Sequence, residues 1–276
     1  MQTEFLDCHK HNLLPKRKRM PEGLKNVVSF LDETLSVSRF RDYGPNGLQV
    51  EGAREVSRVV TGVSANAALI QAAVEAEAQI VVVHHGLVWG GGLTKISGPA
   101  KERLKLLLSN DISLAAYHLP LDRHEALGNN VGLARALSLT GDHEWFGPVK
   151  GEPMALAISL DKPASRESLI KSIRDNVSGG RLPFSFEFGP KEVTKVGLCT
   201  GAASDQLEAA HQQGCELFIT GELAERASEV ARELGLTLVA AGHYATEVFG
   251  PQSLASALNK KFSSLEATFV DVACPL

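Results

Sequence analysis

The chain has 276 residues, of which 44% are hydrophobic and 22% are charged, and its formal net charge is −4. This length favours two domains of ordinary size, and the composition excludes a fibrous fold or disorder for most of the chain. Mild acidity argues against a nucleic-acid partner, because phosphate contacts need clustered lysine and arginine. No apolar run is long enough for a membrane span or a signal peptide, which predicts a cytoplasmic protein that does not contact a membrane. Four scattered cysteines predict reduced thiols.

The first 19 residues differ from the rest of the chain. They contain its one strongly basic run, Lys16–Arg19, and they show no apolar periodicity. We therefore predict that residues 1–19 are a disordered tail or an artefact of an upstream start codon. A phosphate-binding arm is the alternative.

Short apolar runs alternate with helical patterns from residue 23 onward. Apolar residues at helical spacing predict a helix over 23–36, and Gly44–Gly47 predicts a turn. Further helices are predicted over 66–76, 100–109, 165–177, 204–213 and 223–234, and strands over 58–63, 80–83, 112–116, 154–160, 184–188, 195–200, 216–220 and 236–241. Such alternation is typical of βαβ units, so the predicted class is α/β.

The two halves of the chain resemble each other. Moving the second half back by 137 positions places Lys195 on Arg58 and Leu217 on Ile80. We therefore expect two similar α/β domains from an internal duplication, with mainly parallel sheets flanked by helices. The expected limits are 20–126 plus 248–276 for the first domain and 127–247 for the second.

The strongest polar signal is the pair His84–His85, directly after the strand predicted over 80–83. The carboxyl ends of parallel strands are where ligands bind in open α/β sheets, so the pair is a candidate metal site. A lone histidine pair is more often a hydrogen-bonded surface feature. The repeat favours the metal site, because each half ends a strand with a histidine and places a carboxylate four residues later. These pairs are His118 with Asp122 and His243 with Glu247.

Imidazole and carboxylate ligands suit zinc, iron, manganese or nickel. The candidate ligands of two divalent metal ions per chain are His84, His85, Asp122, His243 and Glu247. Five ligands leave open positions for water and substrate. Two divalent cations with two carboxylates keep a net positive charge, which would attract small anions. Two ions that share a water favour hydrolysis by a metal-bound hydroxide. His118 is a sixth ligand, an orienting partner or a catalytic proton carrier.

Three other features have two interpretations each. Glu222 occupies the position that the repeat pairs with the histidines, so it lines the site as a catalytic proton carrier or caps the next helix. Gly128–Asn130 caps a helix starting near Val131 or contacts substrate. Trp89 stacks on a base or sugar, or it packs within its own glycine-rich loop.

These motifs together carry a resemblance. His84–Gly86, Tyr117–Asp122, Leu127–Asn130, Thr220–Glu222, Gly242–Glu247 and Asn46–Val50 resemble segments of the Nif-three-like, or YbgI-like, dinuclear metal centre family, whose members bear the name GTP cyclohydrolase 1 type 2 homologue. The likeness covers residues 21–271. It departs from the family pattern at Asp42–Asn46, which leaves the contacts of that loop open.

The resemblance implies two similar domains with a two-metal centre between them and assembly into a toroidal homohexamer. It assigns the metal ligands to the same five residues, with Glu247 as the bridge. It also implies a hydrolase, with cyclohydrolase-like ring opening of a nucleotide such as GTP as the candidate reaction. The alternative is a non-catalytic metal-binding, metal-storage or ring-shaped scaffold protein.

Overall fold

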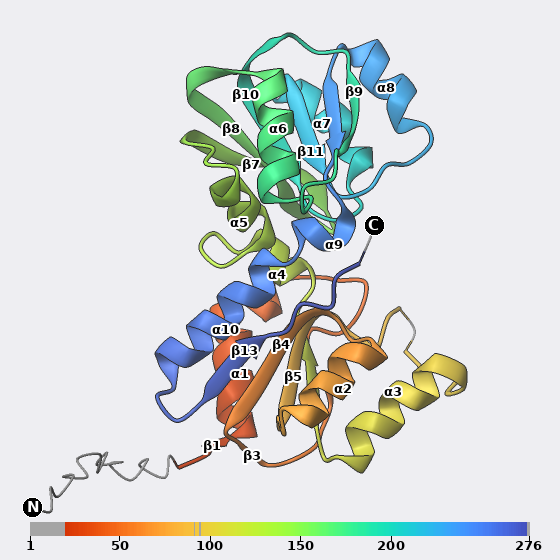
Figure 1. The fold of residues 1–276 in the computed structure, drawn as a ribbon, viewed down its shortest axis with the longest axis vertical. Helices are drawn as coiled ribbons and strands as arrows, with labels where there is room; N and C mark the ends of the chain where they lie inside the picture. The colour runs from red at the N-terminus through yellow and green to blue at the C-terminus, as the bar shows by residue number, and fades with distance from the viewer. Residues whose placement is uncertain (1–19, 91, 94, 275–276) are drawn as a thin grey trace, which may run out of the picture.

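Two β-sheets organise the chain, and each lies in one of the two lobes that Figure 1 shows one above the other. The computed structural model describes residues 20–90, 92–93 and 95–274. The tail predicted over residues 1–19 lies outside this range. Within the described part, no helix is both long and apolar enough to cross a membrane.

The lower lobe contains a five-stranded sheet. Its strands, in spatial order, are β13 (Glu266–Phe269), β4 (Arg58–Ser64), β5 (Ile80–His85), β6 (Ser113–Ala116) and β2 (Gly47–Val50). The first four are parallel, and β2 joins antiparallel to β6. A short antiparallel pair, β1 (Glu22–Gly23) with β3 (Glu55–Val56), lies beside it. The expectation of a mainly parallel sheet holds for this lobe.

Helices cover both faces of the first sheet, because its central strands are apolar on both sides. In β5, Ile80 and Val82 pack with the helices α1 (Leu24–Thr34) and α10 (Phe249–Lys261). The alternate residues Val81 and Val83 share a core with α2 (Ala67–Glu75) and α3 (Gly98–Ser109). Successive residues of Ile80–Val83 therefore face opposite sides of the sheet, although all four are hydrophobic.

The upper lobe contains a six-stranded mixed sheet. Its strands, in order, are β7 (Gly141–Val149), β8 (Glu152–Ser165), β10 (Glu192–Cys199), β11 (Leu217–Thr220), β12 (Thr237–Ala240) and β9 (Phe184–Glu187). Only β10, β11 and β12 are mutually parallel. The other three pairs are antiparallel: β7 with β8, β8 with β10, and β12 with β9. β7 and β8 form a hairpin, and β9 lies at the opposite edge of the sheet.

The helices of the upper lobe also cover both faces of their sheet. α5 (Asn129–Ala136) and α6 (Arg166–Asn176) contribute to one core, and α7 (Leu207–Gln212) and α8 (Ala227–Leu234) contribute to the other. α8 starts four residues later than its sequence pattern predicts. Two short 3₁₀ helices, Val37–Arg39 and Ser204–Gln206, complete the regular elements with α4 (Leu119–Arg123) and α9 (His243–Thr246).

The strand registers follow the alignment of the two halves. In the first sheet Val59 pairs with Ile80, and Ile80 pairs with Ser113. In the second sheet Val196 pairs with Leu217, and Leu217 pairs with Thr237. These pairs are the ones that the repeat equates, which supports our interpretation of an internal duplication. We propose the two lobes as the two domains, with the limits expected from the sequence.

Candidate metal centre

The two histidines at the end of β5 point their side chains into the junction between the lobes. His84 is fully buried, and its Nδ1 donates to the backbone oxygen of Tyr117 at 3.0 Å. Nδ1 of His85 lies 3.0 Å from Ser64 Oγ at the end of β4. The ring centroids of the pair are 4.5 Å apart. In both residues, therefore, Nδ1 has a partner and Nε2 is left to face the junction.

His118 follows β6 and is held by Asp42, a residue of the loop for which the sequence predicted no contact. Nδ1 of His118 lies 2.7 Å from Asp42 Oδ1, and the backbone N–H of Leu119 donates to Asp42 Oδ2 at 2.8 Å. Asn46 donates a further hydrogen bond to Asp42. Burial favours a neutral acid, but the hydrogen bonds from His118 and Asn46 lower the pKa of Asp42. The loop that departs from the family pattern thus orients His118.

Asp122 lies one helical turn after His118, on α4, and is buried. Its Oδ1 accepts hydrogen bonds from Asn129 Nδ2 at 2.8 Å and from Thr200 Oγ1 at 3.2 Å. The same oxygen lies 3.4 Å from His84 Nε2. These contacts hold the Asp122 carboxylate against His84, which belongs to the lower lobe.

The short helix α9 supplies His243 and Glu247, four residues apart. Glu222 lies 2.7 Å from His243 Nδ1, which leaves His243 Nε2 directed at Glu247 Oε2, 3.2 Å away. Glu247 is 2% exposed and also lies 3.4 Å from His84 Nε2 and 3.3 Å from His85 Nε2. One buried carboxylate therefore contacts three imidazoles, which is the geometry expected of a residue shared between two ions.

The predicted ligands lie close together in the folded chain. They form three overlapping groups, within each of which the candidate ligand atoms lie within 4.8 Å of one another: His84, His85 and His118; His85, His243 and Glu247; and His84, Asp122 and Glu247. Asp122 and Glu247 thus approach the same place from different segments. All six residues that were predicted from their positions at or after strand ends therefore lie in one cluster.

Two buried atoms of this cluster test whether a cation fits. Among the described residues, His84 Nε2 and Glu247 Oε2 are buried polar atoms that make no hydrogen bond and have only ion-pair contacts, at 3.4 Å and 3.2 Å or more. An orphaned polar atom in a buried site costs about 1–3 kcal/mol, and more when it is charged. A divalent ion bound to both atoms would remove that cost. The donor set of imidazole nitrogens and carboxylate oxygens suits zinc, iron, manganese or nickel.

The electrostatics of the cluster also favour positive charge. Burial disfavours a charged His84, yet Asp122 and Glu247 raise its pKa to about 10. Burial likewise opposes protonation of His243, but Glu247 raises its pKa to about 9. Burial and the nearby cationic His84 lower the pKa of His85 to about 3. The two carboxylates therefore attract protons in the absence of metal, as they would attract a metal cation.

A cleft of about 420 Å³ opens onto the cluster. His85, His118, Asp122, His243 and Glu247 line one side, and Leu119, Val149, Met154, Cys199 and Ala203 add an apolar lining. Trp89 also lines it, with its ring centroid 5.1 Å from that of His118 and its Nε1 donating to the Gly86 oxygen. The cleft therefore has room for a ligand beside the metal centre.

Several residues that the sequence left open have defined contacts. Glu222 does not cap α8, whose first residue is Ala227, but contacts His243. Gly128 is the N-cap residue of α5, as one interpretation of Gly128–Asn130 expected, and the helix starts at Asn129. The side chains of Asn129 and Asn130 do not cap the helix but bind the Asp122 segment, since Asn129 donates to the carboxylate and Asn130 to the backbone oxygen. His143 and His211 are exposed and belong to none of the three groups of candidate ligands.

Gly201 gives a test of the close packing around Glu247. It has a φ of +71°, and a Cβ there would lie 2.4 Å from Glu247 Oε1 and 3.3 Å from His243 Nε2. We expect Gly201→Ala to displace these side chains and to lower metal affinity about tenfold or more. Gly235→Ala is the matched control, because Gly235 has a φ of +61° with nothing within 4 Å of a Cβ. Calorimetric metal titration of both variants checks this, and equal affinities would contradict it.

Known proteins resemble this chain over most of its length. A family model described as Duf34/NIF3 (NGG1p interacting factor 3) matches residues 23–275. A Pseudomonas aeruginosa protein named GTP cyclohydrolase 1 type 2 homolog is 42% identical over 259 residues, which cover 93% of this chain and 99% of the relative. An Escherichia coli protein of the same name is 41% identical over 250 residues, covering 90% of this chain and 98% of that protein.

Solved structures give the same result. Protein ybgI, described as of unknown function, matches with a TM-score of 0.85 and 39% identity, covering 92% of this chain and all of that one. TTHA1606 from Thermus thermophilus matches with a TM-score of 0.82 and 34% identity, with the same coverage of this chain. The resemblance seen in the sequence motifs is confirmed, and the chain belongs to the Duf34/NIF3 family.

Proposed function

We propose that this protein is a dinuclear metal-dependent hydrolase that acts on a small anionic substrate, with a nucleotide as the candidate. The observation that carries the proposal is the convergence of four imidazoles and two carboxylates in one cluster, of which all but the buried His84 line an open cleft. A closed structural site would have no such cleft. The name of the curated relatives, GTP cyclohydrolase 1 type 2 homolog, supports GTP as the first substrate to test.

The residues that would hold the ions are His84, His85, Asp122, His243 and Glu247. Glu247 is the proposed bridge, because its two oxygens contact different histidines. Two bound divalent cations would supply Lewis acidity and make a water nucleophilic near neutral pH. Tyr117 O and the Glu222 carboxylate accept from Nδ1 of His84 and His243 and so leave Nε2 of both rings for an ion, and Ser64 Oγ orients the His85 ring.

The proton carriers that we propose are His118 and Glu222. Asp42 holds His118 at Nδ1, so Nε2 is the atom that accepts or donates a proton toward the cleft. Glu222 is half-exposed and contacts His243, which places it at the edge of the cluster. Trp89 offers an aromatic surface beside His85 and His118 on which a base can stack.

Formate release from GTP tests this function. Hydrolytic opening of the imidazole ring and loss of its one-carbon unit would yield formate and a pyrimidine nucleotide. We expect zinc- or manganese-loaded protein to release formate, and His118→Gln to slow turnover about 100-fold with metal content unchanged. A fully loaded protein that releases no product from GTP or from other nucleotides would contradict the hydrolase and favour a metal-binding or scaffold role.

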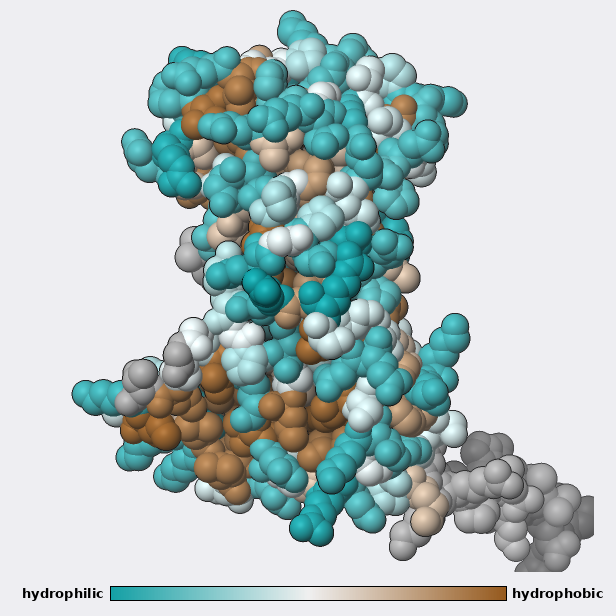
Figure 2. All heavy atoms as spheres, turned by 180° about the vertical axis from the view of Figure 1, so that it is seen from behind, coloured by the Kyte–Doolittle hydropathy of each residue, from teal (hydrophilic) through white to brown (hydrophobic). Residues whose placement is uncertain are grey.

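Self-association is the partner class that we propose, with a toroidal homohexamer as the expected form. Large hydrophobic side chains in the lower lobe are exposed, among them Leu48, Leu93, Ile96 and Leu108. Figure 2 shows hydrophobic residues gathered over this lobe. Such surfaces are typical of protein interfaces. Sedimentation velocity tests the assembly, and a chain that sediments only as a 29.6 kDa monomer would contradict it.

A further inference from the structure

A second, larger cavity lies away from the metal centre. It has a volume of about 890 Å³ and runs along α10, between α1 on one side and α5 with the loop before it on the other. None of its fourteen lining residues also lines the cleft of the metal centre. Any ligand that binds here is therefore independent of the proposed hydrolase.

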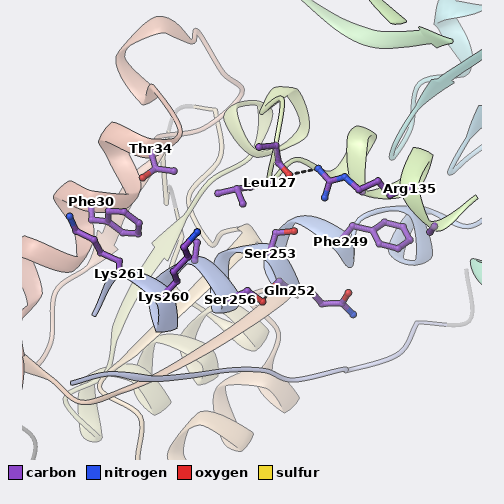
Figure 3. A pocket seen from close by; sticks show the side chains of 14 residues that line it. Phe30, Thr34, Leu127, Arg135, Phe249, Gln252, Ser253, Ser256, Lys260 and Lys261 are labelled. Atoms are coloured by element: carbon purple, nitrogen blue, oxygen red, sulfur yellow. Dashed lines mark hydrogen bonds between the residues drawn. The ribbon is translucent and has the colours of Figure 1, made fainter. Parts of the chain in front are cut away.

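The groove, defined by these fourteen residues, has hydrophobic side chains at both ends and between them, beside neutral polar residues of α10. Figure 3 shows the Phe30 ring at one end, Phe249 at the other and Leu127 between them. Phe30 packs edge-on against Phe262 with ring centroids 5.5 Å apart. A Cβ on Gly132 would lie 2.3 Å from Phe249 Cβ, so the glycine lets this aromatic residue pack against α5. Both aromatic ends are thus held by packing.

The polar residues of the groove are all neutral or positive. Arg135, Lys260 and Lys261 contribute three cations, and no carboxylate is among the lining residues. Within the described part of the chain, these three cations form no ion pair. Arg135 donates to the Ala126 oxygen, and Lys261 lies over the Phe30 ring at 5.6 Å. Uncompensated positive charge therefore borders an apolar surface.

We propose that this groove binds an anionic amphiphile, a molecule with one alkyl chain and a carboxylate or similar acidic head. The alkyl chain lies along α10 between Phe249 and Phe30, and the head pairs with Lys260 and Lys261. The lining from Phe249 to Lys261 spans about 18 Å of helix, enough for an extended chain of roughly twelve carbons. The volume is in the range of small-molecule sites. The chain's own basic run, Lys16–Arg19, has the wrong sign of charge for this groove.

Calorimetric titration with dodecanoate, below its micelle concentration, tests the proposal on the full chain. We expect saturable binding, and a loss of about tenfold or more in affinity for the double variant Lys260→Glu with Lys261→Glu. The control is Lys101→Glu with Lys105→Glu, which reverses two exposed charges on α3, across the sheet from α10. It should bind dodecanoate like the native protein. Dodecyltrimethylammonium, with the same chain and a cationic head, should bind at least tenfold more weakly.

A filling variant gives a second measurement. Ala257 is half-buried in the groove, and Ala257→Trp should prevent dodecanoate binding while leaving metal content unchanged. Should this variant fail to fold, the charge-reversal pair, whose residues are exposed, still decides the question. Equal binding of the anionic and cationic amphiphiles would overturn the proposal. So would an acidic helical peptide that binds this groove when dodecanoate does not.

Discussion

Replacing Glu247 by glutamine should remove most of the metal from the purified protein. This carboxylate contacts three imidazoles, and the amide has one neutral oxygen in place of two that share a negative charge. We expect metal affinity to fall by more than about 100-fold, beyond the 10–100-fold effect of losing an outer hydrogen-bond partner. Elemental analysis after dialysis against a weak chelator measures the loss, and circular dichroism verifies the fold.

A graded series of variants separates this effect from a general loss of charge. Glu222→Gln replaces the charged acceptor at His243 Nδ1 by a neutral amide oxygen and should weaken binding about tenfold. Glu229→Gln, on the exposed side of α8, should have no effect. His143→Ala and His211→Ala should also retain native metal content, because both histidines lie on the surface. Equal metal in Glu247→Gln and Glu229→Gln would show that the cluster is not the site.

Chelating the metal should lower the melting temperature of the native protein by about 10 °C. A ligand at about 1,000 times its Kd stabilises the folded state by about 4 kcal/mol, and each kcal/mol corresponds to about 2–4 °C in a domain of 150–250 residues. The buried atoms His84 Nε2 and Glu247 Oε2 lose their partner when the ion leaves. Differential scanning calorimetry before and after chelation measures the shift.

The variant Glu247→Gln is the control for this experiment. Because it cannot hold the ions, its melting temperature should respond little to added zinc or to chelator. Restoring metal to the native protein should restore its transition. A native protein that melts at one temperature with and without metal would show that the ions contribute no folding energy at this site.

The clustering of the proposed ligands was predictable from the sequence because these residues lie at or just after the ends of strands whose apolar runs are unambiguous. His84 and His85 extend β5 itself, and the repeat places His118 and His243 at corresponding strand ends. Parallel pairing brings the ends of β5 and β6 to one edge of the lower sheet, and His243, which follows β12 of the upper sheet, meets them through Glu247. The helices α1, α2 and α6 were equally clear, since each buries apolar residues at helical spacing.

The partners of the ligands were not predictable in this way. Asp42 lies in an irregular loop, and its contact with His118 depends on a separation of 76 residues. Thr200 and Gly201 reach the site only because β10 ends beside β11. The edge strand β7 was missed because its residues Asp142–Glu144 are exposed, so it lacks the alternation that marks a half-buried strand. Long-range contacts of single polar residues leave no local pattern.

Anomalous diffraction from crystals grown with zinc or manganese would locate the ions in the candidate metal centre. We expect two peaks per chain, about 3.5–4 Å apart, between Glu247 and the Nε2 atoms of His84, His85 and His243. Each peak should lie about 2.0–2.2 Å from its nitrogen or carboxylate ligands. Crystals with ions only elsewhere on the chain, or with an empty cluster at saturating metal, would contradict this expectation.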